Sequence, residues 1–152
     1  MSATITLSLS EVLALEAELN GLVNPSSGEV IIEGFLKEKL SLGDKYWLEK
    51  LATKLASEKK LIDKLRNELI EKFGEKNEDG QFAIMPFLDT EEEGVQEQNP
   101  KFAEFQKEFS ELLSQEKEIS YRPLPFDALN KIESETAYSM IFKIVAEPED
   151  GE

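Results

Sequence analysis

The segment from residue 44 to residue 73 constrains the fold most, because apolar side chains recur along it every seven residues. This spacing is typical of a long amphipathic helix that buries a narrow stripe. Asp44 is a suitable N-cap, and Gly74 stands where helices commonly end in a left-handed residue. The stripe consists of Leu48, Leu55, Ile62 and Leu69.

A second helix is predicted over 100–117, where Pro100 suits the first turn. Phe102, Phe105 and Phe109 share one face of it at helical spacing. Two helices joined by a connection of about 25 residues are expected to return as an antiparallel hairpin. Phenylalanines facing a leucine stripe would form the largest apolar contact of the chain, at roughly 1.5–3 kcal/mol per buried side chain.

The N-terminal region predicts a strand and then a helix. Residues 4–9 alternate apolar and polar side chains, as a half-buried strand does. Ser8 and Glu11 have the spacing of a capping box, so a helix should follow to about residue 23. Residues 118–126 predict an edge strand, because two prolines there cannot donate to a ladder, and we expect them to pair with 4–9.

Three further segments are short. Residues 24–28 predict a loop, and 32–41 a short helix. Residues 134–145 begin with Ser134 as a plausible cap and favour a helix, although their alternating side chains would also suit a strand.

These elements predict an α+β fold, mostly α, in a single domain over 1–146. Residues 75–99 are expected to form an acidic, mobile connector, because self-repelling charge with few apolar residues resists ordering. Residues 147–152 form an acidic tail.

The net charge of −15 is unevenly distributed. Residues 44–73 carry eight basic and six acidic side chains, whereas 74–120 carry four basic and thirteen acidic ones. A chain this acidic should be repelled by nucleic acid and by anionic membranes. The absence of cysteine removes disulfides and thiol chemistry, and the absence of histidine removes the usual neutral-pH base and metal ligand. We therefore expect no cofactor.

Residues 75–86 resemble the first half of a calcium-binding loop. Glu75, Asn77, Asp79 and Gly80 match its first, third, fifth and sixth positions. The twelfth position, which should supply a bidentate glutamate, is Pro86. A helix end followed by an Asp-Gly turn is the favoured interpretation.

Three stretches together resemble a family of small proteins of unknown function encoded by tailed bacteriophages. They are "TLSLSEVLALEAEL" (6–19), "LIEKFGEKNEDG" (69–80) and "NPKFAEFQKEFSELLSQEKEISYRPLPFDAL" (99–129). The resemblance covers most of the chain and is most specific at 69–80 and 109–129. It implies a phage origin and a strand–helix–hairpin–strand plan, and it carries over no catalytic residues.

Five residues are candidates for contact with a partner. Tyr46 and Trp47 are adjacent at the start of the long helix, where at most one can face the core. The other either packs over a loop, which is the favoured interpretation, or is exposed and anchors a partner. Glu104, Glu108 and Glu111 share a face of the second helix, which is either its solvated side or a surface for a basic partner.

The main hypothesis is a non-enzymatic phage protein with a structural, assembly or adaptor role, located in the virion or the host cytoplasm. Its partner would be a phage structural protein, and a homo-oligomer stays open. The alternative hypothesis is an acidic inhibitor, including a nucleic-acid mimic, of a basic host protein that acts in defence or binds nucleic acid. Neither hypothesis involves direct binding of nucleic acid or of a membrane.

Overall fold

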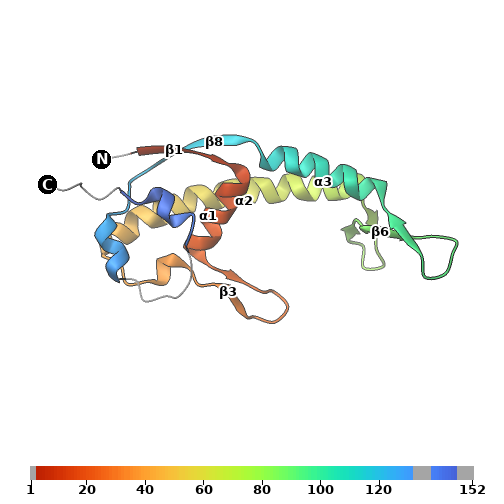
Figure 1. Ribbon diagram of the computed structural model, residues 1–152, viewed down its shortest axis with the longest axis horizontal. Helices are drawn as coiled ribbons and strands as arrows, with labels where there is room; N and C mark the ends of the chain where they lie inside the picture. Colours follow the sequence, from red (N-terminus) through yellow and green to blue (C-terminus); the bar gives the residue numbers. More distant parts are fainter. Residues whose placement is uncertain (1–2, 132–137, 147–152) are drawn as a thin grey trace. The chain divides into compact units, whose positions relative to one another are not determined.

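Helices and small two-stranded sheets make up the computed structural model, which describes residues 3–131 and 138–146 (Figure 1). The backbone groups into two compact units, residues 1–59 with 116–152 and residues 60–115. The long helix α2 (Leu42–Phe73) contributes residues to both units. We had expected a single domain over 1–146.

In the first unit, β1 (Ala3–Ser8) pairs antiparallel with β8 (Glu116–Tyr121). The register joins Ala3 to Tyr121 and Ser8 to Glu116, and Figure 1 shows the two strands side by side. The predicted pairing of the N-terminal strand is therefore confirmed. The strand lies earlier in the chain than the predicted range 118–126: β8 begins at Glu116 and ends at Tyr121, before Pro123 and Pro125.

Helix α1 (Leu9–Asn20) begins at the predicted capping box. The Ser8 hydroxyl accepts from the Glu11 N–H, and the Glu11 carboxylate accepts from the Ser8 N–H, both at 3.1 Å. The helix stops at Gly21 rather than at residue 23, because the chain continues into a hairpin of β2 (Leu22–Val23) and β3 (Val30–Ile32). The predicted loop 24–28 is the turn of this hairpin.

The predicted helix over 32–41 was wrong: a 3-10 turn, η1 (Phe35–Lys37), forms there. Two further 3-10 helices are η2 (Phe126–Lys131) and η3 (Ile141–Ile144). The prediction of one helix over 134–145 falls partly outside the described residues, and from 138 on the chain forms η3 alone. Its end lies beside residue 124 in a parallel bridge between Leu124 and Val145.

The core belongs to the first unit. It is formed by side chains from α1, the first turns of α2, the paired strands β1 and β8, and the 3-10 helices. Its most deeply buried side chains are Leu7, Val12, Leu15, Leu19, Phe35, Leu48, Leu55, Ile141 and Ile144.

One carboxylate lies inside this core. Glu18, only 6% exposed, accepts hydrogen bonds from the backbone N–H groups of Met140 and Ile141 at 2.9 to 3.1 Å. A buried charge is tolerated when donors of this kind surround it. Glu18 thereby connects α1 to the start of η3.

Helix α2 starts two residues earlier than predicted, and its first turn is capped by Ser41, whose hydroxyl accepts from the Asp44 N–H at 3.1 Å. It ends at Phe73, as predicted, although Gly74 is not left-handed. A Cβ on Gly74 would lie 2.5 Å from the Ile70 carbonyl oxygen and 2.7 Å from that of Ala83. Close approach of the following hairpin, rather than the sign of φ, thus requires glycine there.

The second unit contains two hairpins where we predicted a mobile connector over 75–99. Strands β4 (Glu75–Lys76) and β5 (Phe82–Ala83) form one hairpin, and β6 (Phe87–Asp89) and β7 (Gln96–Gln98) form the other. Gly80 and Gly94, with φ near +80°, provide the turns. Whether this segment is mobile stays a prediction.

Helix α3 (Pro100–Leu113) begins as predicted, behind Asn99 as N-cap. It ends four residues earlier than predicted, because Glu116 and Lys117 belong to β8. No side chain of α3 is buried, and its phenylalanines are only half-buried. The expectation that they form the largest apolar contact was wrong. A contact from α3 to α2 is the ion pair of Glu108 with Lys72, at 3.5 Å.

The charge on Glu11 predicts how stability depends on pH. Hydrogen bonds from the Lys143 ammonium and the Ser8 N–H hold the pKa of Glu11 below its ordinary value. A lowered pKa stabilises the fold fully above the ordinary value, and this stabilisation disappears as the pH falls through the folded value. Glu11→Gln keeps the capping box but removes the charge. We expect its deficit in unfolding free energy to be largest at neutral pH and to shrink on acidification.

Chemical denaturation from pH 7 to pH 3 measures this deficit. In a Lys143→Met background the deficit should be smaller and less dependent on pH. A deficit that grows as the pH falls would contradict the assignment.

Candidate functional site

An open groove of about 660 Å³ runs along α2 beside the end of β8, within the first unit. A volume of this order is within the range of ligand-binding clefts. Helix α2 contributes residues from about two turns, and the chain at the end of β8 contributes the others. The lining residues are Trp47, Lys50, Leu51, Thr53, Lys54, Ser120, Tyr121 and Arg122. We call this the basic groove.

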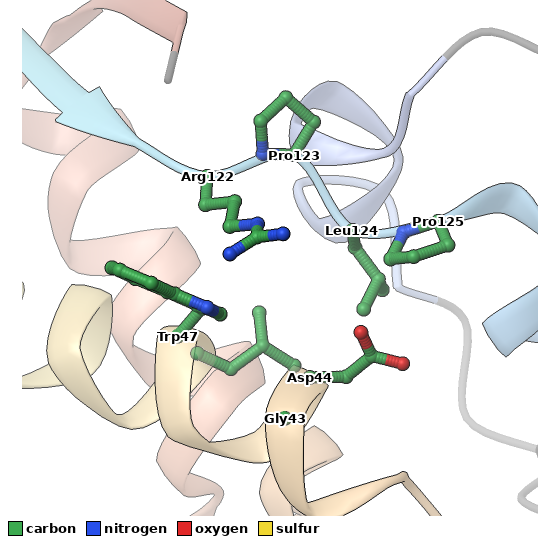
Figure 2. Close-up of a pocket in the computed structure, with 8 residues that line it drawn as sticks. Gly43, Asp44, Trp47, Arg122, Pro123, Leu124 and Pro125 are labelled. Atoms are coloured by element: carbon green, nitrogen blue, oxygen red, sulfur yellow. The ribbon is translucent and has the colours of Figure 1, made fainter. Parts of the chain in front are cut away.

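A smaller pocket of about 170 Å³ adjoins the groove. Trp47 and Arg122 line both cavities. Figure 2 shows the Arg122 side chain extending from the strand side toward the indole of Trp47, with the Asp44 carboxylate on the helix side of the pocket. The residues are Gly43, Asp44, Trp47, Leu48 and the four from Arg122 to Pro125. We call this the end pocket.

Two aromatic side chains and two cations pack together at the groove. The rings of Tyr46 and Trp47 meet edge to face, with centroids 5.1 Å apart. The Lys50 ammonium lies 5.3 Å from both centroids, and the Arg122 guanidinium carbon lies 5.1 Å from that of Trp47. These are cation–π distances. The contacts hold large aromatic side chains at the surface, where Tyr46 is 53% and Trp47 37% exposed.

Helix and strand are also joined by a hydrogen bond. The Lys54 ammonium donates to the backbone carbonyl of Ser120 at 2.9 Å. One turn further along, Glu58 forms an ion pair with Lys117 of β8. Glu58 is thus engaged within its own chain.

The five predicted contact residues lie in both units. Tyr46 and Trp47 belong to the first unit, and both are exposed, whereas packing over a loop was the favoured interpretation. Glu104, Glu108 and Glu111 belong to α3 in the second unit. Glu104 and Glu111 are exposed, whereas Glu108 is engaged by Lys72.

The sequence analysis missed the basic residues of the groove. Lys50 and Lys54 follow Trp47 at spacings of three and seven, so helical periodicity alone could have placed them on its face. Arg122 gave no local signal, because only the pairing of β8 with β1 and its packing beside α2 bring it to Trp47.

The calcium-like loop forms a turn, as favoured above. The Asn77 side-chain oxygen accepts from the N–H groups of Asp79 and Gln81, each at 3.0 Å. This oxygen is therefore committed to the backbone. Within residues 3–131 and 138–146, no three acidic side chains gather closely enough to hold a metal ion.

Among the helices of the described ranges, none is both long enough and apolar enough to cross a bilayer. Comparisons of the chain with protein-family models, with curated proteins and with solved structures found no match. The geometry of the basic groove is thus the basis on which a function is assigned.

Proposed function

We propose that this protein acts without enzymatic activity, through protein–protein contacts made by the basic groove. The observation that supports this is the group of Tyr46, Trp47 and Arg122 at one solvent-accessible site. Tryptophan, tyrosine and arginine are the residue types that contribute most binding energy at protein interfaces. They are also enriched there relative to the rest of protein surfaces.

The resemblance to small proteins of tailed phages suggests which partner to look for. A phage structural protein would make this chain a virion component, an assembly factor or an adaptor, located in the virion or the host cytoplasm.

Lysine-directed cross-linking with mass spectrometry, in infected cells and in purified virions, tests this role. We expect cross-links from Lys50 to a phage structural protein, and their loss in Trp47→Ala. Phe142, 63% exposed outside the groove, provides the matched control, because Phe142→Ala removes an exposed aromatic elsewhere in the same unit. Circular dichroism verifies that both variants fold. Absence from virions together with no structural-protein partner would refute the proposal, as would equal loss in the control.

We further infer that α3 and the C-terminal turns of α2 form an antiparallel helical hairpin. The ion pair of Lys72 with Glu108 supports a register in which Leu69 lies near Leu112. In a parallel arrangement of the same ion pair, Leu69 would instead lie near Phe105.

Because the chain has no cysteine, two introduced thiols report on this register directly. We expect Leu69→Cys/Leu112→Cys to be joined by a short bifunctional reagent much faster than Leu69→Cys/Phe105→Cys. Faster joining of the second pair would show that the antiparallel arrangement is wrong.

An acidic inhibitor is the second candidate function. Glu104 and Glu111 are exposed on an ordered helix, as a mimic of a phosphate row requires. We expect a basic host protein to bind the chain. DNA should compete with the chain for this host protein, and added salt should steeply weaken the complex. Glu104→Gln/Glu111→Gln should reduce that binding, whereas Glu91→Gln/Glu93→Gln in the β6–β7 turn should not. Binding that DNA does not compete for would exclude this function.

A further inference from the structure

The charge of the basic groove is opposite to that of the chain. The chain carries −15 overall, yet three of the described residues that line the groove are basic and none is acidic. The end pocket contributes a carboxylate, that of Asp44. Within the described part of the chain, Lys50 and Arg122 form no ion pair. Two cations at this site therefore lack a counter-ion among those residues.

The position of Arg122 favours a carboxylate as that counter-ion. A guanidinium that packs against an aromatic ring keeps N–H donors that can bind both oxygens of one carboxylate. Lys50 packs against the same indole, and that indole, 37% exposed, adds apolar surface to the groove. The groove thus offers charge and apolar contact together.

The dimensions of the groove favour a short segment. From Trp47 to Lys54 the helix rises roughly 10 Å, at about 1.5 Å per residue. An extended peptide covers this distance with about three residues, at roughly 3.3 Å each. A helical ligand would present only two turns along it, whereas an extended one can place alternate side chains toward the cations.

A long polyanion fits this surface poorly. Screening confines the attraction of three cations to about 8–10 Å at physiological salt. Beyond that distance a nucleic acid would meet a protein of net charge −15, whereas a short acidic segment would not extend far enough to be repelled.

We propose that the basic groove binds a short, extended, acidic segment of a partner protein, whose carboxylates pair with Arg122 and with Lys50. This inference rests on the proposed function and specifies the chemistry of its partner. The carboxylates act as the missing counter-ions, and apolar side chains of the segment pack on the exposed face of Trp47.

Trp47 is the only tryptophan of the chain, so its fluorescence reports on the groove. The probe is an eight-residue synthetic peptide in which glutamate alternates with valine and threonine, titrated into the full chain. We expect the emission of Trp47 to change saturably, and the affinity to fall as salt is added. A peptide with glutamine in place of glutamate should bind at least tenfold more weakly.

Variants localise the binding. Arg122→Gln and Lys50→Gln should each lower the affinity at least fivefold. Lys107→Gln, which removes a positive charge from α3 in the other unit, should change it less than twofold. An equal loss in Lys107→Gln would overturn the proposal, because the effect would then be one of overall charge.

Other occupants of the groove give distinct results, each of which overturns the proposal. One is tighter binding of a single-stranded oligothymidine than of the acidic peptide. Another is a dimer, seen by sedimentation, that Arg122→Gln dissociates. A third is a fivefold gain in peptide affinity on deletion of residues 147–152, which would make the acidic end of the chain the occupant.

The peptide titration and the cross-linking in cells separate this inference from the proposed function. If the acidic peptide does not bind while Trp47→Ala still abolishes cross-links to the partner, the inference is wrong and the proposed function stands. If the peptide does not bind and the cross-links are also independent of Trp47, both are wrong.

Discussion

The pairing of β1 with β8 is the contact on which the basic groove depends. It joins residues more than a hundred positions apart, from Ala3 with Tyr121 to Ser8 with Glu116. Leu7 and Ile119 point from these strands into the core, so the pair is anchored on one face. Arg122 directly follows β8, and its place beside Trp47 is consequently set by a strand that begins the described chain.

The core explains why this arrangement is specific. Ile141 and Ile144 fill the space beside α1, and the carboxylate of Glu18 accepts the N–H groups that begin η3. Apolar contacts alone would tolerate small shifts of such a short helix. The buried carboxylate of Glu18 does not tolerate such shifts, because a shift would break its hydrogen bonds and leave a buried charge without partners. Glu18 thus fixes the segment that runs beside Leu124.

Features that depend on neighbouring residues could be predicted from the sequence. The capping box at Ser8 and Glu11, the extent of α2 and the start of α3 all follow from short-range rules of capping and periodicity. The Asp-Gly turn at Gly80 was predicted, but the strands of both hairpins in 75–99 and the turn at Gly94 were missed, because the acidic composition of the segment suggested disorder. Composition describes a whole segment, but a hairpin requires only a few suitably placed residues.

Features that depend on distant residues could not be predicted in the same way. The phenylalanines of α3 have the spacing of a core face, yet the core formed elsewhere, because burial depends on what a face meets rather than on the face itself. The same holds for the candidate site. Tyr46 and Trp47 could be predicted as contact residues from their neighbours in the sequence. Arg122 could not, because it reaches Trp47 only through the pairing of β8 with the distant strand β1.

Placing a few cations on an acidic body has a physical consequence beyond the groove. Salt screens the groove and the acidic surface alike, so a ligand that stays inside the groove meets mainly its cations, whereas a longer polyanion also meets the carboxylates around them. A ligand is accepted when its negative charge is short enough to remain inside the local field. The same two cations would offer much less discrimination on a neutral protein. The carboxylates that surround the groove therefore contribute to its selectivity, although none of the described residues that line the groove is acidic.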